Sequence, residues 1–108
     1  RQVLRNLLSN ASRYGGDTIV VDFVQVESQA SIVVSDNGKG VPEEDRERIF
    51  EPYQRSRPED GLTAAIGVGL TVARRLARLM DGELIYEYQD GTSRFQVTLP
   101  ASRVAAEV

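Results

Sequence analysis

Two amphipathic helical segments, each followed by a pair of strand-like segments, constrain what this chain can fold into more than any other feature. Apolar residues recur at helical spacing over residues 1–14 and again from Val68 to Met80. Glycine follows both segments, as the pair Gly15–Gly16 and as Gly82, and glycine commonly ends a helix. The sequence therefore predicts two helices that each have one apolar face to bury.

The four strand-like segments fall into two neighbouring pairs. Residues 18–26 and 30–35 are rich in Val, Ile and Phe, and residues 83–88 and 94–99 alternate apolar with polar side chains. The second pair is joined around Asp90–Gly91, a dipeptide that favours a tight hairpin turn. We expect a mixed, mostly antiparallel sheet packed against about three helices, which is a two-layer α/β sandwich.

The stretch between the first hairpin and the second long helix carries two further predictions. Pro42 and the acidic residues after it predict a short helix that ends near Phe50. Residues 52–66 contain prolines, several charges and no period, and we interpret them as a mobile lid over a binding site. Residues 101–108 show no core pattern, so we expect one domain over residues 1–100 followed by a short tail.

Composition excludes several kinds of function. The chain has 108 residues, 41% of them apolar, which suffices for one core, and no apolar run approaches the roughly 20 residues that cross a bilayer. It contains no cysteine and no histidine, which excludes disulfides, thiolate metal sites and histidine chemistry within the chain. A net charge of −3 without a basic cluster argues against nucleic acid as a partner. Because the first residues are already helical and no initiator methionine is present, we expect a fragment of a longer protein.

The run NLLSNASRY places polar side chains on one face of the first helix. Asn6, Asn10 and Arg13 are spaced by four and three residues, so they share a face that the leucines do not occupy. An asparagine oxygen is a suitable ligand for Mg²⁺ that is otherwise held by water and phosphate, and Arg13 can neutralise phosphate charge. Tyr14 can add a hydroxyl contact. Taken alone, the run favours an ordinary solvated helix face.

The run DNGKG joins a carboxylate to two glycines. Gly38 and Gly40 permit backbone angles and close approach that a Cβ would forbid, which suits a strand end that turns tightly around a flat ligand. Asp36 then lies at the rim, where its carboxylate can accept a hydrogen bond from an exocyclic amine such as that of adenine. The alternative is a glycine-rich turn that only ends the strand.

The run GVGL comprises Gly67, Val68, Gly69 and Leu70 and is expected to open the second long helix. Backbone N–H groups at a helix start bind phosphate well, and a mobile segment just before them can close over the phosphates. Arg55, within that segment, is a candidate for the γ-phosphate. The alternatives are a glycine pair that serves helix packing and an arginine that is simply solvated.

Taken in order, NLLSNASRY, DNGKG, IFEPYQR and GVGL resemble the N box, first G box, F box and second G box of the ATP-binding catalytic domain of sensor histidine kinases. The resemblance extends from Val3 to Pro100 and places the chain with the GHKL superfamily, whose Bergerat fold is shared with DNA gyrase and MutL. It implies ATP and Mg²⁺ as cofactors.

The resemblance also implies a role for each motif residue. Asn10 would hold Mg²⁺, Asn6 would line the same wall, and Arg13 and Tyr14 would lie near the phosphates. The remaining positions would divide between the base, the phosphates and the lid: Asp36 on the adenine amino group, Gly38 and Gly40 around the base, Gly67 to Leu70 at the phosphates, Phe50 as the F-box aromatic, and Arg55 as the cation after it. From its own sequence context we expect Phe50 mainly to pack in the core.

Asn6 distinguishes between reaction types within the superfamily. The ATPases and related serine kinases resemble one another in carrying a glutamate at this position, placed to activate water or a hydroxyl. An asparagine here implies a site that holds ATP while a separately supplied nucleophile attacks. Because the chain has no histidine, the resemblance implies a histidine-bearing dimerisation domain in the same parent protein and a response regulator downstream.

Two departures from the family pattern leave other functions open. Ala65 stands where the second G box often has its first glycine, and the strand that usually precedes the first helix is missing, which leaves a sheet edge unpaired. A degenerate nucleotide-sensing or docking domain is therefore the main alternative, and an ATPase or serine kinase of the same fold is the other. We expect a monomeric, cytoplasmic domain without membrane contact, and whether the parent is membrane-anchored stays open.

Overall fold

The computed structural model describes residues 2–14, 16–46, 49–50 and 61–107. The elements in chain order are α1 (Gln2–Tyr14), β1 (Ile19–Val26), β2 (Gln29–Asp36), the 3-10 turn η1 (Glu43–Asp45), α2 (Gly61–Leu79), β3 (Glu83–Gln89), β4 (Thr92–Pro100) and α3 (Ala101–Glu107). Both long helices and both hairpins predicted from the sequence are therefore confirmed.

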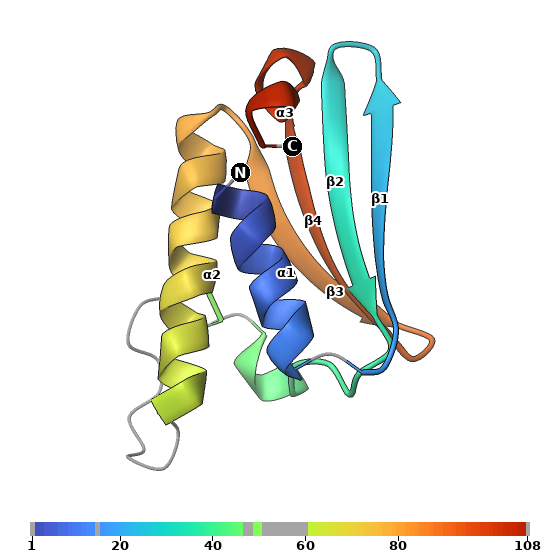
Figure 1. Cartoon of the computed structure of the whole chain (residues 1–108), viewed down its shortest axis with the longest axis vertical. Coiled ribbons are helices and arrows are strands. Elements are labelled where there is room, and N and C mark those ends of the chain that lie inside the picture. The colour runs from blue at the N-terminus through green and yellow to red at the C-terminus, as the bar shows by residue number, and fades with distance from the viewer. Residues whose placement is uncertain (1, 15, 47–48, 51–60, 108) are drawn as a thin grey trace.

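The strands form one sheet in the order β1-β2-β4-β3. Every pairing among them is antiparallel, and β2 pairs with β4 to join the two hairpins, with Ile32 opposite Val97 and Val34 opposite Phe95. Helices α1 and α2 lie side by side along the sheet, while α3 packs beside β2 and β4 (Figure 1). The expected two-layer α/β sandwich is confirmed.

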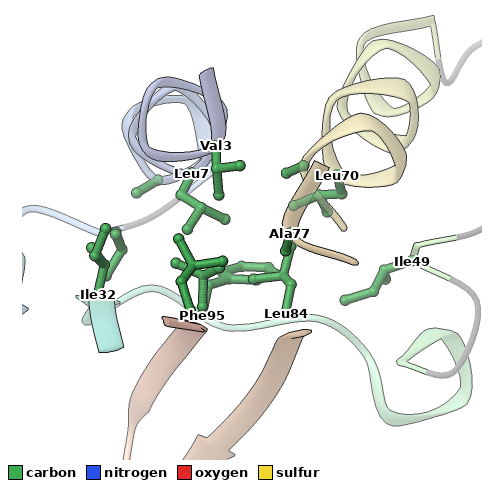
Figure 2. Packing of buried hydrophobic residues seen from close by; sticks show 13 residues of the cluster. Val3, Leu7, Ile32, Ile49, Leu70, Ala77, Leu84 and Phe95 are labelled. Carbon is green, nitrogen blue, oxygen red and sulfur yellow. The ribbon is translucent and has the colours of Figure 1, made fainter. Parts of the chain in front are cut away.

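The core lies between the two long helices and the sheet. Strands β2 and β4 turn alternate residues toward the helices, and those residues, which include Ile32 and Phe95, are buried. Val3 and Leu7 lie four residues apart on α1 and are fully buried. Figure 2 shows both pointing toward the sheet, with Leu70 of α2 beside them. Removing this apolar surface from water is what holds the helices on the sheet.

Strand β1 forms an edge of the sheet and is exposed on both faces. Phe23 lies opposite Ile32 and so shares its helix-facing side, yet Phe23 is 53% exposed. On the other face Val24 and Val26 are 51% and 66% exposed. The helices therefore cover β2 and β4 but leave most of β1 open.

Helix α2 begins earlier than the sequence pattern indicates. Residues 61–66, expected to belong to the lid, form its first turns, so the run GVGL lies inside the helix instead of opening it. This correction has a local cause, because Leu62, Ala64 and Ala65 are strong helix formers and no proline interrupts them. Residues 52–60 of the expected lid lie outside the described residues. Of the short helix expected to end near Phe50, the described residues show only η1.

The residues after Pro100 form helix α3, where the apolar pattern predicts only a tail. Val104 packs against the core, and Glu107 is 6% exposed. The Glu107 carboxylate accepts hydrogen bonds from the N–H groups of Val3 at 2.9 Å and Leu4 at 3.2 Å, both in the first turn of α1. A buried carboxylate leaves no trace in an apolar pattern, which explains why the pattern misses this segment. None of the described helices is long and apolar enough to span a bilayer.

Glu83 ties the end of α2 to the start of β3. Its Oε1 accepts a hydrogen bond from the Leu84 N–H at 2.9 Å, and the Nε atoms of Arg74 and Arg78 lie 3.4 and 3.2 Å from its carboxylate oxygens. Partial burial alone would raise the pKa of the Glu83 carboxyl. The Leu84 N–H and the two guanidinium groups favour the charged form more strongly than burial disfavours it, so the pKa of Glu83 lies below its ordinary value.

The lowered pKa makes Glu83 a source of acid-sensitive stability. A carboxyl whose pKa is lower in the folded state than in the unfolded state stabilises the fold when the pH is above the unfolded-state pKa. This contribution is lost as the pH falls through the folded-state pKa. We expect Glu83→Gln to lower the free energy of unfolding at neutral pH, and its difference from wild type to narrow from about pH 5 downward. Urea denaturation at a series of pH values measures this difference.

Glu87→Gln is the matched control, because it removes a carboxylate from the same strand, one that lies 2.9 Å from Arg94 Nη1. A Glu83→Gln difference that stays constant, or that widens in acid, would contradict the linkage to this carboxyl.

Candidate functional site

The asparagines of NLLSNASRY lie on the flank of α1. Asn6 and Asn10 are half-buried, whereas Val3, Leu7 and Ala11 form the buried stripe against the sheet. The predicted separation of a polar face from an apolar one is therefore confirmed. Arg13 and Tyr14 lie in the last turn of the helix, and their side chains are outside the described part of the chain.

Asn6 links the two long helices. Its Nδ2 donates a hydrogen bond to the backbone carbonyl of Gly69 in α2 at 3.2 Å. The runs NLLSNASRY and GVGL are thereby brought together across 63 residues of sequence. Beside Gly69, an added Cβ would meet none of the described residues within 4 Å, so they leave this surface open. Leu70 points the other way and is buried in the core. Gly67 and Val68 are helical, and the N–H groups of the whole run lie within the helix rather than at its free start.

Asp36 occupies the place of a core residue at the end of β2. The inward series along this strand is Ala30, Ile32, Val34 and Asp36, and Asp36 is only 7% exposed. Its Oδ1 accepts a hydrogen bond from the Gly38 N–H at 2.8 Å. A carboxylate has a second oxygen that can accept from a ligand. The chain thus puts a buried acceptor at the point where the strand gives way to a glycine turn.

Asn37 joins the glycine turn after β2 to the turn after α1, a role that its sequence position does not predict. Its Oδ1 accepts from the Thr18 N–H at 3.1 Å, and its own N–H donates to the Thr18 carbonyl at 3.4 Å. An added Cβ on Gly16 would collide with the Asn37 side chain, so the two turns are in close contact. The end of α1 and the loop after β2 therefore lie together at one end of the molecule (Figure 1).

Gly40 has a φ of +77°, and the ring of Tyr88 lies against its backbone. A Cβ at this position would come within 2.4 Å of Tyr88 Cδ1 and 2.8 Å of Tyr86 Oη. The Val41 N–H donates to the Tyr86 hydroxyl at 2.8 Å. Glycine is thus required at position 40 both for its backbone angle and for the close approach of the two tyrosines. The motif spacing points to neither tyrosine.

Phe50 packs as expected. Its ring meets the buried Phe95 ring edge-on at a centroid distance of 6.4 Å, and the Arg74 guanidinium lies 5.0 Å from its centroid. The hydroxyl of Thr71 in α2 donates to the Phe50 carbonyl at 2.8 Å, which ties Phe50 to the helix. Arg55 lies outside the described residues.

The described residues contain no group of three or more carboxylate, histidine or cysteine side chains that could hold a metal ion.

Residues 1–103 match the family described as histidine kinase-, DNA gyrase B-, and HSP90-like ATPase, so the chain belongs to this family of ATPase domains. It is 36% identical over 101 residues to the sensor protein RstB of Escherichia coli, covering 92% of the chain and 23% of that protein. It is 40% identical over 108 residues to the adaptive-response sensory kinase SasA of a Synechococcus species, covering 96% of the chain and 28% of that protein.

The fold also resembles the solved structures of two histidine kinases. The catalytic domain of histidine kinase ThkA superposes with a TM-score of 0.77 at 25% identity, covering 93% of this chain and 64% of that one. The mycobacterial sensor histidine kinase MprB superposes with a TM-score of 0.75 at 25% identity, covering 92% of this chain and 68% of that one. The chain spans about a quarter of the length of the curated relatives it matches, 23% of RstB and 28% of SasA.

Gly40 and Gly91 have the same backbone angle but different surroundings. Alanine substitutions at the two positions therefore distinguish the cost of the positive φ from the cost of a steric contact. Gly40 and Gly91 both have a φ of +77°, but a Cβ on Gly91 would meet nothing within 4 Å. We expect Gly91→Ala to lower the free energy of unfolding by about 1 kcal/mol. Gly40→Ala should cost roughly 1–3 kcal/mol more, because the new methyl group meets two tyrosine side chains.

Urea denaturation of both variants measures the difference. In Gly40→Ala combined with Tyr88→Ala, part of the loss should be recovered. Equal losses for the two single variants would show that the tyrosines do not restrict position 40.

Proposed function

We propose that this domain binds ATP with Mg²⁺ and donates the γ-phosphoryl group to a histidine on a separate dimerisation domain of the same parent protein. The observation that carries the proposal is Asp36, a buried carboxylate at the end of β2 beside a glycine turn, in a chain of an ATPase family with sensor kinases among its relatives.

The base binds at the loop after β2. Because Gly38 engages Oδ1 of Asp36, the second oxygen accepts a hydrogen bond from the adenine amino group. Gly38 and Gly40 leave the adenine ring room to approach the backbone. A carboxylate, which only accepts hydrogen bonds when ionised, discriminates against guanine, since guanine presents a carbonyl oxygen where adenine presents the amine.

The phosphates lie along the open flank of α1 and α2. Asn10 would supply an amide oxygen to Mg²⁺, and the ion when bound would neutralise charge on the transferring group. From their motif positions we assign Arg13, Tyr14 and Arg55 to the phosphates. The surface beside Gly69 supports this course, because no residue in the described part of the chain would lie within 4 Å of an added Cβ there. Gly67 to Leu70 would then border the phosphates.

The domain positions ATP but does not supply the nucleophile. Asn6 is a neutral amide whose Nδ2 faces the Gly69 carbonyl, and the chain has no histidine, so no base for hydrolysis stands at position 6. A histidine nitrogen of the dimerisation domain forms the bond to the γ-phosphorus as the bond to the bridging β–γ oxygen breaks, and ADP leaves. The phosphoryl group then passes to a response regulator. Because ATP is its donor, we place the domain in the cytoplasm.

Asp36→Asn tests the base contact with little change in shape. The asparagine can keep its oxygen on the Gly38 N–H, which turns its NH₂ group toward the base, where it opposes the adenine amine. We expect ATP affinity to fall roughly tenfold or more, and the preference for ATP over GTP to narrow. Isothermal titration calorimetry with ATP and GTP in the presence of Mg²⁺ measures both.

Asp22→Asn, which removes an exposed carboxylate from β1, is the matched control and should bind ATP as wild type does. If folded wild-type protein binds neither ATP nor ADP, the proposed function is wrong.

Phosphoryl transfer is tested with the full-length parent protein and γ-labelled ATP. We expect label on histidine, recognised by its lability in acid and stability in base, and its loss in Asn10→Ala. ATP binding without labelled histidine would instead indicate a nucleotide-sensing or docking domain. Steady ATP hydrolysis by the domain alone, abolished by Asn10→Ala, would indicate an ATPase.

A further inference from the structure

The loop after β2 is fastened to the sheet through one hydroxyl group. The Val41 N–H donates a hydrogen bond to Tyr86 Oη at 2.8 Å, and Ser93 Oγ donates to the same oxygen at 3.1 Å. A phenolic oxygen has lone pairs for both donors. Because Tyr86 belongs to β3 and Ser93 to β4, the hydroxyl joins the far end of the loop to two strands of the second hairpin.

Arg46 holds the other backbone polar group of Val41, its carbonyl. Its Nε donates to the Val41 carbonyl at 2.9 Å. Its guanidinium carbon lies 5.9 Å from the ring centroid of Tyr86 and 5.5 Å from that of Tyr88, within the range of a cation–π contact. Both the N–H and the carbonyl of Val41 are thus bound by side chains from outside the loop.

The position of the Tyr86 hydroxyl is set by the core. The Tyr86 ring lies 4.7 Å from the ring of Phe95, centroid to centroid, at an angle of 50°, and Phe95 is 2% exposed. A rigid aromatic packed on a buried one places its oxygen with little freedom. The loop therefore takes its position from the packed sheet as well as from its own glycines.

We propose that Tyr86, assisted by Arg46 and Ser93, is a positioning residue for nucleotide binding: it holds the loop of residues 36–41 so that the Asp36 carboxylate and the Gly38 and Gly40 backbone match the base. This rests on the proposed function in taking the base to bind at this loop. At one end the loop is fixed by the bond from Gly38 to Asp36, and at the other by Val41 on Tyr86. A loop held at both ends loses less conformational freedom when the base binds, which strengthens binding.

Tyr86→Phe removes the hydroxyl and keeps the ring on Phe95. We expect ADP affinity to fall roughly five- to thirtyfold, the preference for ADP over GDP to narrow, and exchange of the Val41 amide proton to accelerate. Calorimetry measures the affinities, and hydrogen exchange followed by NMR measures the amide. Tyr88→Phe is the matched control, because it removes a neighbouring hydroxyl but keeps the ring beside Arg46, and it should leave all three quantities unchanged.

Several outcomes would overturn the proposal. If the Val41 amide exchanges at the same rate in Tyr86→Phe and wild type, the hydrogen bond does not hold the loop. If exchange accelerates while ADP and GDP affinities stay at wild-type values, the anchor does not position the base site. The failure of the proposed function is separate, because it appears as absence of nucleotide binding in folded wild-type protein.

Arg46→Met keeps the inference testable if Tyr86→Phe does not fold. This variant keeps an apolar stem but removes the donor to the Val41 carbonyl and the charge beside the two rings. We expect the same direction of change in ADP affinity and in the ADP-over-GDP ratio. Wild-type values of both in a folded Arg46→Met protein would overturn the anchor.

Discussion

The burial of one stripe of α1 against the sheet is the constraint on which the other features depend. Val3, Leu7 and Ala11 are buried at intervals of four residues, and this fixes how the helix is rotated about its axis. With that rotation fixed, Asn6 and Asn10 must fall on the flank that faces α2 and solvent. A rotation that buried them would leave amide groups in an apolar layer without partners, at a cost comparable to the burial gained. The packing of α1 against the sheet therefore also determines the direction in which its polar face points.

A second constraint acts at the end of β2, where the alternation of the strand continues one step past its apolar residues. Asp36 takes the next inward position after Val34, so a carboxylate stands where the core ends. Burial of this group is tolerated because the Gly38 N–H meets one of its oxygens. The same turn then runs against Tyr86 and Tyr88 of β3. The local hydrogen bond of Gly38 to Asp36 and the bond of Val41 to the Tyr86 hydroxyl together hold the loop in place.

The sequence predicted those parts of the structure that arise from local periodicity. The 3.6-residue and two-residue patterns located α1, most of α2 and all the strands, and the Asp90–Gly91 turn has the positive φ values at both residues that such a turn requires. Helix α3 was missed because its main buried group is the carboxylate of Glu107, and the first turns of α2 were missed because charges and prolines upstream masked them. The contacts of Asn6 with Gly69 and of Tyr86 with Val41 join residues far apart in the chain, and no spacing within one sequence encodes such pairs.

The hydrogen bond from Asn6 to the Gly69 carbonyl gives one residue two duties that cannot be exchanged separately. A glutamate at this position would bring a base for hydrolysis, but an ionised carboxylate has no proton to donate, and its charge would stand against the carbonyl oxygen. Replacement of Asn6 by glutamate would therefore remove this hydrogen bond, and the buried apolar residues of the two helices would continue to hold α1 beside α2. A change of chemistry at position 6 would thus also change one of the contacts between the two long helices.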